Sequence, residues 1–268
     1  MNHSIRWVIQ NNLGSSSEID ALFQACLDLG IEAMPVKVTP FSDELPDVPV
    51  DKKVIFYGSP RFIANALNAG RWAPCAFWDD ELFSFSHWQK RYGDLLLNHD
   101  GIVEELGHFL SSKTFVDEDV FFMRPDRDVK EFAGQLMSVK EIRKWVDKLS
   151  KLDNEGTVGM ATKVVVAAPK TLHHEWRLFL VEGRVVSGSH YRRYGSLEVH
   201  PTLPSEVIAF AEEAAGIWQP AKAFVMDVGQ VRDSLKIIEI NGINSTGFYA
   251  SDVKTVINAV SKVAATEA

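Results

Sequence analysis

Apolar and polar positions alternate with two different periods in the first third of the chain. Short, mostly apolar segments at residues 5–9, 33–38 and 54–57 predict strands. Between the first two, the apolar residues of 19–27 recur at the spacing of a helix that buries one face. A further helix is expected after the turn at 58–60. This order of strands and helices predicts a small parallel α/β unit.

The rest of the chain has a different pattern, in which strands are joined by tight turns. Two hairpins are predicted, one from residues 175–181 and 184–191 and one from residues 224–228 and 235–240. Residues 77–113 are rich in aromatic side chains and predict a connector between two lobes. Further elements are predicted as strands at 120–123 and 163–168 and helices at 139–152, 204–216 and 251–264. The predicted fold class is α+β, with an α/β N-terminal unit followed by antiparallel sheets and helices.

Composition narrows the possible classes of protein. A chain of 268 residues, 46% hydrophobic and 24% charged, is typical of a globular protein of one large domain or two modest ones. No apolar run approaches the ~20 residues of a membrane helix, and the N-terminus lacks the features of a signal peptide. Two cysteines make neither a disulfide framework nor a zinc motif. We therefore expect a cytoplasmic protein without membrane partners.

The charge is unevenly distributed. A formal net charge of −8 argues against nucleic-acid binding, which depends on neutralising phosphates. One segment is nevertheless basic, because it contains Lys170, Arg177, Arg184, Arg192 and Arg193. Such a segment indicates either a local anionic ligand or a solvated basic face, and composition does not distinguish them. The adjacent His173 and His174 would point in opposite directions on an extended strand, so we do not predict that they ligate a metal.

The predicted C-terminal hairpin carries acidic side chains in apolar surroundings. Glu239 and Asn241 share one face of its second strand, while Asp227 lies in the neighbouring strand between Met226 and Val228. An unpaired buried carboxylate costs several kcal/mol, and such oxygen ligands suit Mg²⁺. The alternative is an ion pair from each acid to a nearby Arg or Lys. A polar loop at 242–247 is expected beside the same site.

Two other segments have the chemistry of a phosphate or nucleotide site. Arg124 stands at the end of an apolar strand and Lys130 in the loop that follows, where both could contact phosphate oxygens. The alternative is a surface arginine and a solvated loop. After the apolar strand, Ala167 and Ala168 provide a small-residue platform whose backbone could bind adenine.

Glu175 and Arg177 are two residues apart and share a face of the next strand. They offer a carboxylate for ribose hydroxyls and a guanidinium for phosphate. The alternative is a cross-strand ion pair, worth at most about 1 kcal/mol if exposed.

Taken in order, these segments resemble the ATP-grasp superfamily. The resemblance rests on LLNHD at 95–99 and on the later blocks FMRPDRDVKEFAG, VVVAAP, EWRLFLVEGRVVSGSHYR, FVMDV and IIEINGINSTGFY. It is nearest to a clade common in phages and bacteria that has two arginines and one lysine at the nucleotide site. More distantly, the last three blocks resemble the ribosomal-protein glutamate ligases.

The resemblance implies a role for each matching residue of the nucleotide site. Arg124 matches the basic residue that meets the nucleotide phosphates, and Lys130 falls in the loop that covers them. Ala167 and Ala168 match the hinge under adenine, and Glu175 matches the ribose or adenine contact.

The residues around the transferred phosphoryl group follow from the same resemblance. Arg177 matches the γ-phosphate contact, and Arg192 or Arg193 matches the arginine near the moving phosphoryl group. Together with Lys130, Arg177 and Arg192 are the expected catalytic residues. The magnesium ligands that the resemblance implies are Asp227, Glu239 and Asn241.

The resemblance also implies a domain division and an activity. Residues 1–85 would form an α/β unit that precedes the ATP-grasp domain of residues 86–268, with the nucleotide between the two lobes of that domain. The expected activity is an ATP- and Mg²⁺-dependent ligase that joins a small-molecule or peptide carboxylate to an amine through an acyl phosphate. The alternatives are a kinase on the same scaffold, which would phosphorylate a small molecule, and a non-catalytic ATP-binding protein. The identity of the substrates and the oligomeric state do not follow from the sequence.

Overall fold

The chain folds into two compact units, which are described separately. The computed structural model describes residues 4–14, 16–40, 42–111, 114–127, 132–151 and 158–267. Unit 1 consists of Met1–Asp79 and Leu172–Ala268, and unit 2 consists of Asp80–Thr171. The domain division expected between residues 85 and 86 stays a prediction.

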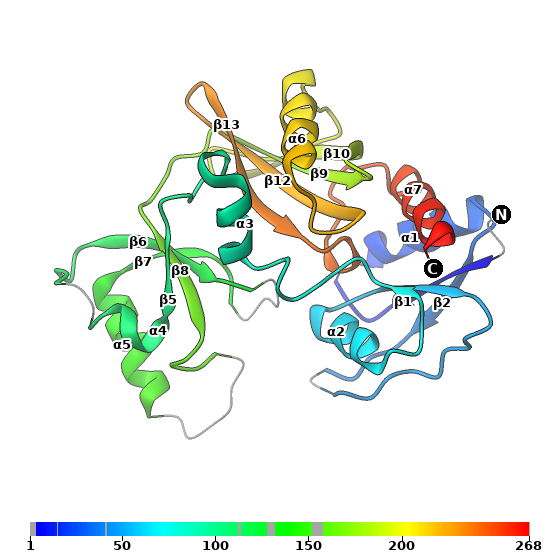
Figure 1. Ribbon diagram of the computed structural model, residues 1–268, viewed down its shortest axis with the longest axis horizontal. Helices are drawn as coiled ribbons and strands as arrows, with labels where there is room; N and C mark the ends of the chain where they lie inside the picture. Colours follow the sequence, from blue (N-terminus) through cyan, green and yellow to red (C-terminus); the bar gives the residue numbers. More distant parts are fainter. Residues whose placement is uncertain are drawn as a thin grey trace. The chain divides into compact units, whose positions relative to one another are not determined.

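Unit 1 begins with a parallel four-stranded sheet of order β2-β1-β3-β4 (Figure 1). Its elements are β1 (Ile5–Gln10), α1 (Ser16–Asp28), β2 (Glu32–Val36), β3 (Lys53–Tyr57), α2 (Pro60–Ala69) and β4 (Pro74–Cys75). Every residue of β1 is buried, because the central strands of a parallel sheet are covered on both faces. The predicted parallel α/β unit is therefore present.

The second sheet of unit 1 is antiparallel and has the order β11-β10-β9-β12-β13. Its elements and the helices that follow them are β9 (His174–Val181), β10 (Arg184–Arg193), β11 (Ser196–His200), α6 (Ser205–Ile217), β12 (Ala223–Val231), β13 (Ser234–Asn241), the short 3-10 helix η3 (Ile243–Ser245) and α7 (Val253–Thr266). Both predicted hairpins are present, as β9–β10 and β12–β13. Helix α6 packs against β10 and β12 (Figure 1).

The two sheets of unit 1 share one hydrophobic core. Alternate residues of β1 and β3 on one face, such as Trp7 and Ile55, join the apolar faces of α1 and α7. Phe179 and Val225 add the apolar face of the antiparallel sheet to the same cluster. The opposite face of the parallel sheet is covered by α2, whose Phe62 packs in a second cluster. The N-terminal and C-terminal thirds of the chain thus depend on each other for burial.

Unit 2 contains an antiparallel sheet of order β5-β8-β6-β7. Its elements are α3 (Phe85–Tyr92), the 3-10 helix η2 (Gly93–Leu95), β5 (Ile102–Glu105), α4 (Leu106–Phe109), β6 (Val120–Pro125), β7 (Gln135–Ser138), α5 (Val139–Ser150) and β8 (Lys163–Ala167). Helix α5 begins with a capping box, in which Ser138 and Glu141 satisfy each other's backbone N–H groups. Its Ile142 packs with Phe109 and Val164 in the core of this unit.

Three predicted features need correction. Residues 77–113 are not only a connector, because they contribute strand β5 to the sheet of unit 2. The short strands β7 and β11 were not predicted, since each is largely exposed and lacks a clear apolar alternation. The α+β class is confirmed by the parallel sheet and the two antiparallel sheets. Within the described ranges, no helix combines the length and the apolar character that a membrane span requires.

Candidate functional site

A row of charged residues crosses three neighbouring strands of the antiparallel sheet in unit 1. Arg177 on β9 is directly opposite Asp227 on β12, and Asp227 is directly opposite Glu239 on β13. Directly opposed residues point to the same face of a sheet. The register therefore brings together the guanidinium and both carboxylates that the sequence singled out.

The guanidinium of Arg177 holds Asp227 with two hydrogen bonds. Its Nε donates to one carboxylate oxygen at 2.8 Å and its Nη2 to the other at 2.6 Å. A third N–H donates to the carbonyl oxygen of Gly247 at 3.2 Å. The same Nη2 lies 3.9 Å from a carboxylate oxygen of Glu239. One arginine is thus shared between the two acids and the loop that follows β13.

The electrostatic balance of this row leaves excess negative charge. Burial raises the pKa of Asp227 to about 6, and Glu239 adds to this increase, although Arg177 opposes it. Burial opposes the charge of Arg177, but the carboxylate of Asp227 outweighs it and raises the pKa of Arg177 above its usual range. Arg177 therefore stays charged and does not fully compensate the two acids.

Asn241 completes the acidic group. Its side-chain Nδ2 donates to a carboxylate oxygen of Glu239 at 2.9 Å, and its residue is buried. The alternative of a separate ion pair for each acid holds only in part, since Asp227 pairs with Arg177 and Glu239 shares that arginine. Among the described residues, no three His, Cys, Asp or Glu side chains group in a way that could hold a metal. A cation at this site would need Asn241 or ligand oxygens in addition to the two carboxylates.

Glu175 occupies the same face, two residues from Arg177, but the two do not form the ion pair considered from the sequence. Instead, the buried carboxylate of Glu175 accepts a hydrogen bond from the hydroxyl of Tyr191 at 2.9 Å. A guanidinium nitrogen of Arg192 lies 3.8 Å from its other oxygen. Glu175 therefore connects Tyr191 and Arg192 to the charged row.

A β-bulge decides which of two adjacent arginines reaches this face. Ser189 is opposite Arg177, and regular alternation from Ser189 would place Arg193 on the same face. The register shifts between His190 and Arg192, so that Arg192 is opposite Glu175. The guanidinium of Arg193 instead lies over the ring of Tyr194, at 5.9 Å from its centroid. Of the two alternatives, Arg192 is the one that adjoins the acidic group.

Two stacked tyrosines adjoin the charged row and were missed from the sequence. The rings of Tyr191 and Tyr249 are parallel within 3°, with centroids 4.8 Å apart. The guanidinium carbon of Arg177 lies 5.0 Å from the centroid of Tyr249 and 5.7 Å from that of Tyr191. Tyr249 has a φ of +50°, a strained value for a residue of this size. No pattern in the sequence predicts this conformation.

The loop that carries Tyr249 is tied to the carboxyl ends of the parallel strands. Asn244 donates to the carbonyl oxygen of Phe56 at 2.7 Å and accepts from the backbone N–H of Phe77 at 2.9 Å. The backbone N–H of Phe248 donates to Glu18 at the start of α1, and the ring of Phe248 stacks on Phe179. The polar loop expected at 242–247 is therefore largely structural, because its Asn244 serves the backbone of unit 1.

The remaining predicted nucleotide residues belong to unit 2. Arg124 lies on β6 and is buried, with its guanidinium 5.2 Å from the ring centroid of Trp88. Ala167 ends the adjacent strand β8 and is buried, while Ala168 follows it and is exposed. Lys130 lies outside the described residues. The roles of these four residues stay predictions.

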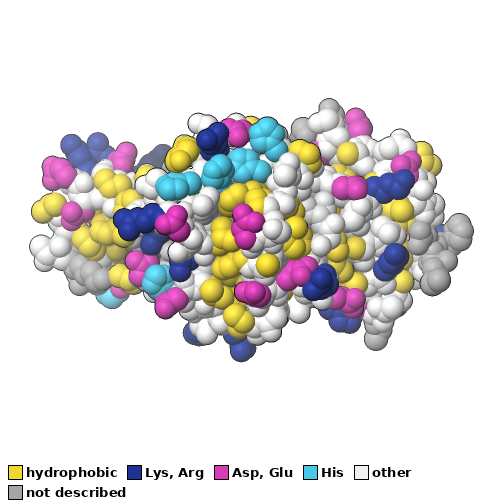
Figure 2. Space-filling model, turned by 90° about the horizontal axis from the view of Figure 1, so that it is seen from above, with side chains coloured by type: hydrophobic (Ala, Val, Ile, Leu, Met, Phe, Trp, Pro, Cys, Tyr) yellow, Lys and Arg dark blue, Asp and Glu magenta, His cyan; other side chains and the backbone are white. Residues whose placement is uncertain are grey.

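The basic segment noted in the sequence is not one cluster. Arg184 forms an exposed ion pair with Glu212, away from the charged row. The histidines gather into one group that is visible in Figure 2, where Nδ1 of His174 lies 3.0 Å from Nε2 of His190 and the ring of His190 stacks on that of His200. These side chains make no group of the kind that could hold a metal among the described residues.

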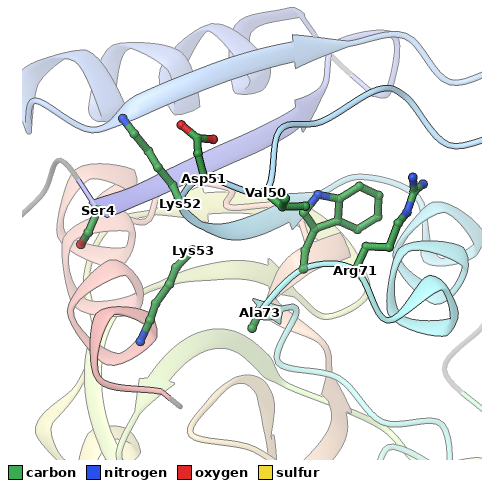
Figure 3. Close-up of a pocket in the computed structure, with 8 residues that line it drawn as sticks. Ser4, Val50, Asp51, Lys52, Lys53, Arg71 and Ala73 are labelled. Atoms are coloured by element: carbon green, nitrogen blue, oxygen red, sulfur yellow. The ribbon is translucent and has the colours of Figure 1, made fainter.

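A separate cavity of about 560 Å³ lies in unit 1, lined by residues that include Lys52, Lys53 and Arg71 (Figure 3). Its lining comes from the amino ends of the parallel strands, where Ser4 precedes β1 and Ala73 precedes β4. Ligands of open parallel sheets bind outside the carboxyl ends of the strands. Since none of the predicted site residues lines this cavity, we do not identify it with the candidate site.

Solved structures with the same fold cover almost the whole chain. A RimK domain protein ATP-grasp from Sphaerobacter thermophilus DSM 20745 is 13% identical, with a TM-score of 0.62 over 95% of this chain and 99% of its own. D-alanine–D-alanine ligase from Bacillus anthracis is 12% identical, with a TM-score of 0.60 over 98% and 99%. D-cycloserine synthetase DcsG is 14% identical, with a TM-score of 0.58 over 97% and 99%. These similarities confirm the predicted fold.

Sequence comparison assigns the family. A search of curated protein sequences found no match. The model of an ATP-grasp domain family, family 3 of the clade named for two arginines and one lysine, matches residues 72–260, which is well over half of the chain. This confirms the resemblance on which ATP, Mg²⁺ and ligase chemistry were predicted. The chain therefore belongs to this third family of ATP-grasp domains within the two-arginine, one-lysine clade.

Proposed function

We propose that the protein is an ATP-dependent carboxylate–amine ligase that works through an acyl phosphate. The observation that carries this proposal is the row of Arg177, Asp227 and Glu239, which joins a guanidinium to two carboxylates on one sheet face. Solved structures of similar fold include D-alanine–D-alanine ligase complexed with ATP and the ATP-grasp ligase PsnB complexed with Mg and ADP. Both complexes agree with a nucleotide and a divalent cation as ligands of this chain.

The donor set of the row fits Mg²⁺. The raised pKa of Asp227 reflects negative charge that Arg177 does not compensate, and a divalent cation would relieve it. Each carboxylate oxygen has two lone pairs, so the two hydrogen bonds from Arg177 leave acceptor capacity on Asp227. Asp227, Glu239 and Asn241 would hold the ion, and phosphate oxygens would complete its shell. Bound there, the ion would neutralise charge on the transferred phosphoryl group.

The residues of the chain would act by positioning and by electrostatics. Arg177 and Arg192 present guanidinium groups that stabilise the charge of the phosphoryl group during transfer. Lys130, in the segment outside the described residues, would add a third cation. Glu175 is held by the hydroxyl of Tyr191 and would accept a ribose hydroxyl. Arg124 would contact the nucleotide phosphates, and Ala167 and Ala168 would support adenine through their backbone.

The proposed reaction has two steps. A substrate carboxylate oxygen attacks the γ-phosphorus of ATP, the bond to the β-phosphate oxygen breaks, and ADP leaves. An amine nitrogen then attacks the acyl carbon, inorganic phosphate leaves, and the amine loses a proton as the amide forms. No protein nucleophile is needed, because the acyl phosphate is already activated.

Trapping by hydroxylamine tests this reaction. We expect that the purified protein with ATP and Mg²⁺ releases ADP in the presence of a subset of free amino acids and short peptides, and that added hydroxylamine yields the hydroxamate of the activated carboxylate. A phosphorylated product without any hydroxamate would favour a kinase instead. Binding of ATP without ADP release from any member of a broad panel of acids and amines would indicate a non-catalytic nucleotide-binding protein.

A further inference from the structure

Tyr249 stands beside the charged row with one ring face unaccounted for by its neighbours in the site. It is 45% exposed, although it stacks on the buried ring of Tyr191. The exposed part of Tyr249 therefore adjoins the carboxylates of Asp227 and Glu239, both of which influence its pKa after the larger effect of burial. An exposed aromatic ring in a reaction site is a candidate contact for substrate.

The distances show which face of the ring is open. Parallel rings in contact are about 3.5 Å apart, so a group on the outer face of Tyr249 would lie about 7 Å from the plane of Tyr191. The guanidinium of Arg177 is only 5.7 Å from the centroid of Tyr191. Arg177 therefore lies at the side of the stack rather than on the outer face of Tyr249. Tyr191 covers the inner face, which leaves the outer face for a ligand.

The position of the ring is fixed by its neighbours rather than by its own preference. The preceding residue, Phe248, is buried between Phe179 and Tyr57, at ring-centroid distances of 5.0 Å and 5.9 Å. With Phe248 anchored, the positive φ of Tyr249 turns its side chain onto Tyr191. A strained conformation that the surrounding contacts impose is a feature of functional sites.

The charges around the stack select the kind of group that would bind there. The guanidinium groups of Arg177 and Arg192 already lie within 5.7 Å of the Tyr191 ring centroid. A third cation on the outer face of Tyr249 would be repelled by these two. A neutral aromatic ring avoids this repulsion and gains from stacking.

We propose that Tyr249 determines substrate specificity, by stacking its outer face against an aromatic side chain next to the reacting group of the substrate. The substrate class is thus an amino acid, or the end of a peptide, that carries an aromatic side chain. This inference rests on the proposed ligase function. It concerns binding of one substrate and leaves nucleotide binding to the residues described above.

The test compares aromatic and small substrates in matched variants. ADP release is measured with ATP, Mg²⁺ and a panel of L- and D-phenylalanine, tyrosine, tryptophan, alanine and serine, and of dipeptides built from them. For wild type we expect turnover with an aromatic member. In Tyr249→Ala, the ratio of kcat/KM for that member to kcat/KM for its alanine counterpart falls about three- to tenfold, the range of an aromatic pair. The loss appears mainly in KM for the aromatic substrate, while KM for ATP is unchanged.

Two further variants separate the ring from general disturbance of the fold. Tyr249→Phe keeps the ring and should keep the wild-type ratio. Tyr194→Ala is the matched control, because Tyr194 is also exposed and has a similar φ of +45°, but stacks with His173 and Arg193 instead of the site residues. Its ratio should match wild type.

The outcomes distinguish this inference from the function on which it rests. Turnover restricted to small or polar members, an unchanged ratio in Tyr249→Ala, or equal losses in Tyr249→Phe and Tyr249→Ala would each overturn the role of the ring and leave the ligase proposal standing. Absence of ADP release with every panel member and with broader acids and amines would remove both.

Discussion

Replacing Arg177 by alanine tests the electrostatic account of the charged row. In the wild-type protein the side chain of Arg177 is 12% exposed and that of Asp227 is 2% exposed, so the ion pair between them is buried. Removing one partner of a buried pair leaves an uncompensated charge and costs about 3–5 kcal/mol. We expect Arg177→Ala to lower the free energy of unfolding by this amount at pH 8, where Asp227 is ionised.

The loss should depend on pH, and its sign follows from the pKa of Asp227. The folded-state pKa of about 6 is above the ordinary value of 3.8, so stability from this group is present at low pH and declines as the pH rises through 6. Arg177 opposes the increase in pKa, so its removal raises the pKa further. Each additional unit adds about 1.4 kcal/mol to the difference between pH 5 and pH 8. The variant should therefore be much less impaired at pH 5, where Asp227 is largely protonated.

Urea denaturation followed by tryptophan fluorescence at both pH values provides the measurement. The double variant Arg177→Ala/Asp227→Asn removes the stranded charge and should recover at least ~2 kcal/mol at pH 8 relative to the single variant. Arg184→Ala is the matched control, since Arg184 is 77% exposed and its ion pair with Glu212 should contribute less than about 1 kcal/mol at either pH. An equal loss at both pH values, or a double variant no more stable than the single one, would contradict the reasoning.

Two further predictions concern the metal and the packing of the sheet. Glu239→Gln should abolish magnesium-dependent ADP release and the rise in melting temperature produced by ATP with Mg²⁺, while Glu213→Gln on the exposed face of α6 should change neither; normal turnover in Glu239→Gln would remove the metal assignment. Gly188→Ala should cost about 1–3 kcal/mol in thermal denaturation, because its Cβ would lie 2.5 Å from a backbone oxygen of β9. Gly216→Ala, where no atom lies within 4 Å of the added Cβ, should be neutral or stabilising, and equal effects at the two glycines would refute this packing argument.

Local patterns were sufficient to predict most of the elements. Buried strands such as β1 and β3 and the hairpins β9–β10 and β12–β13 have strong apolar patterns and tight turns, which act over a few residues. The same local rule, alternation of side chains along a strand, placed Glu239 and Asn241 on one face, where they are hydrogen-bonded. The short strands β5, β7 and β11 depend on pairing with distant segments and have no comparable local signal.

The sequence by itself therefore determined the kinds of side chain available for a nucleotide and metal site, because their type and spacing are local properties. Only the tertiary structure decided how they combine. The register that aligns Arg177, Asp227 and Glu239 depends on pairing across three strands, and a slip of one residue would reverse their faces. The bulge that selects Arg192 over Arg193 depends on long-range pairing in the same way. The orientation of Tyr249 likewise follows from the burial of Phe248 in a core assembled from both ends of the chain.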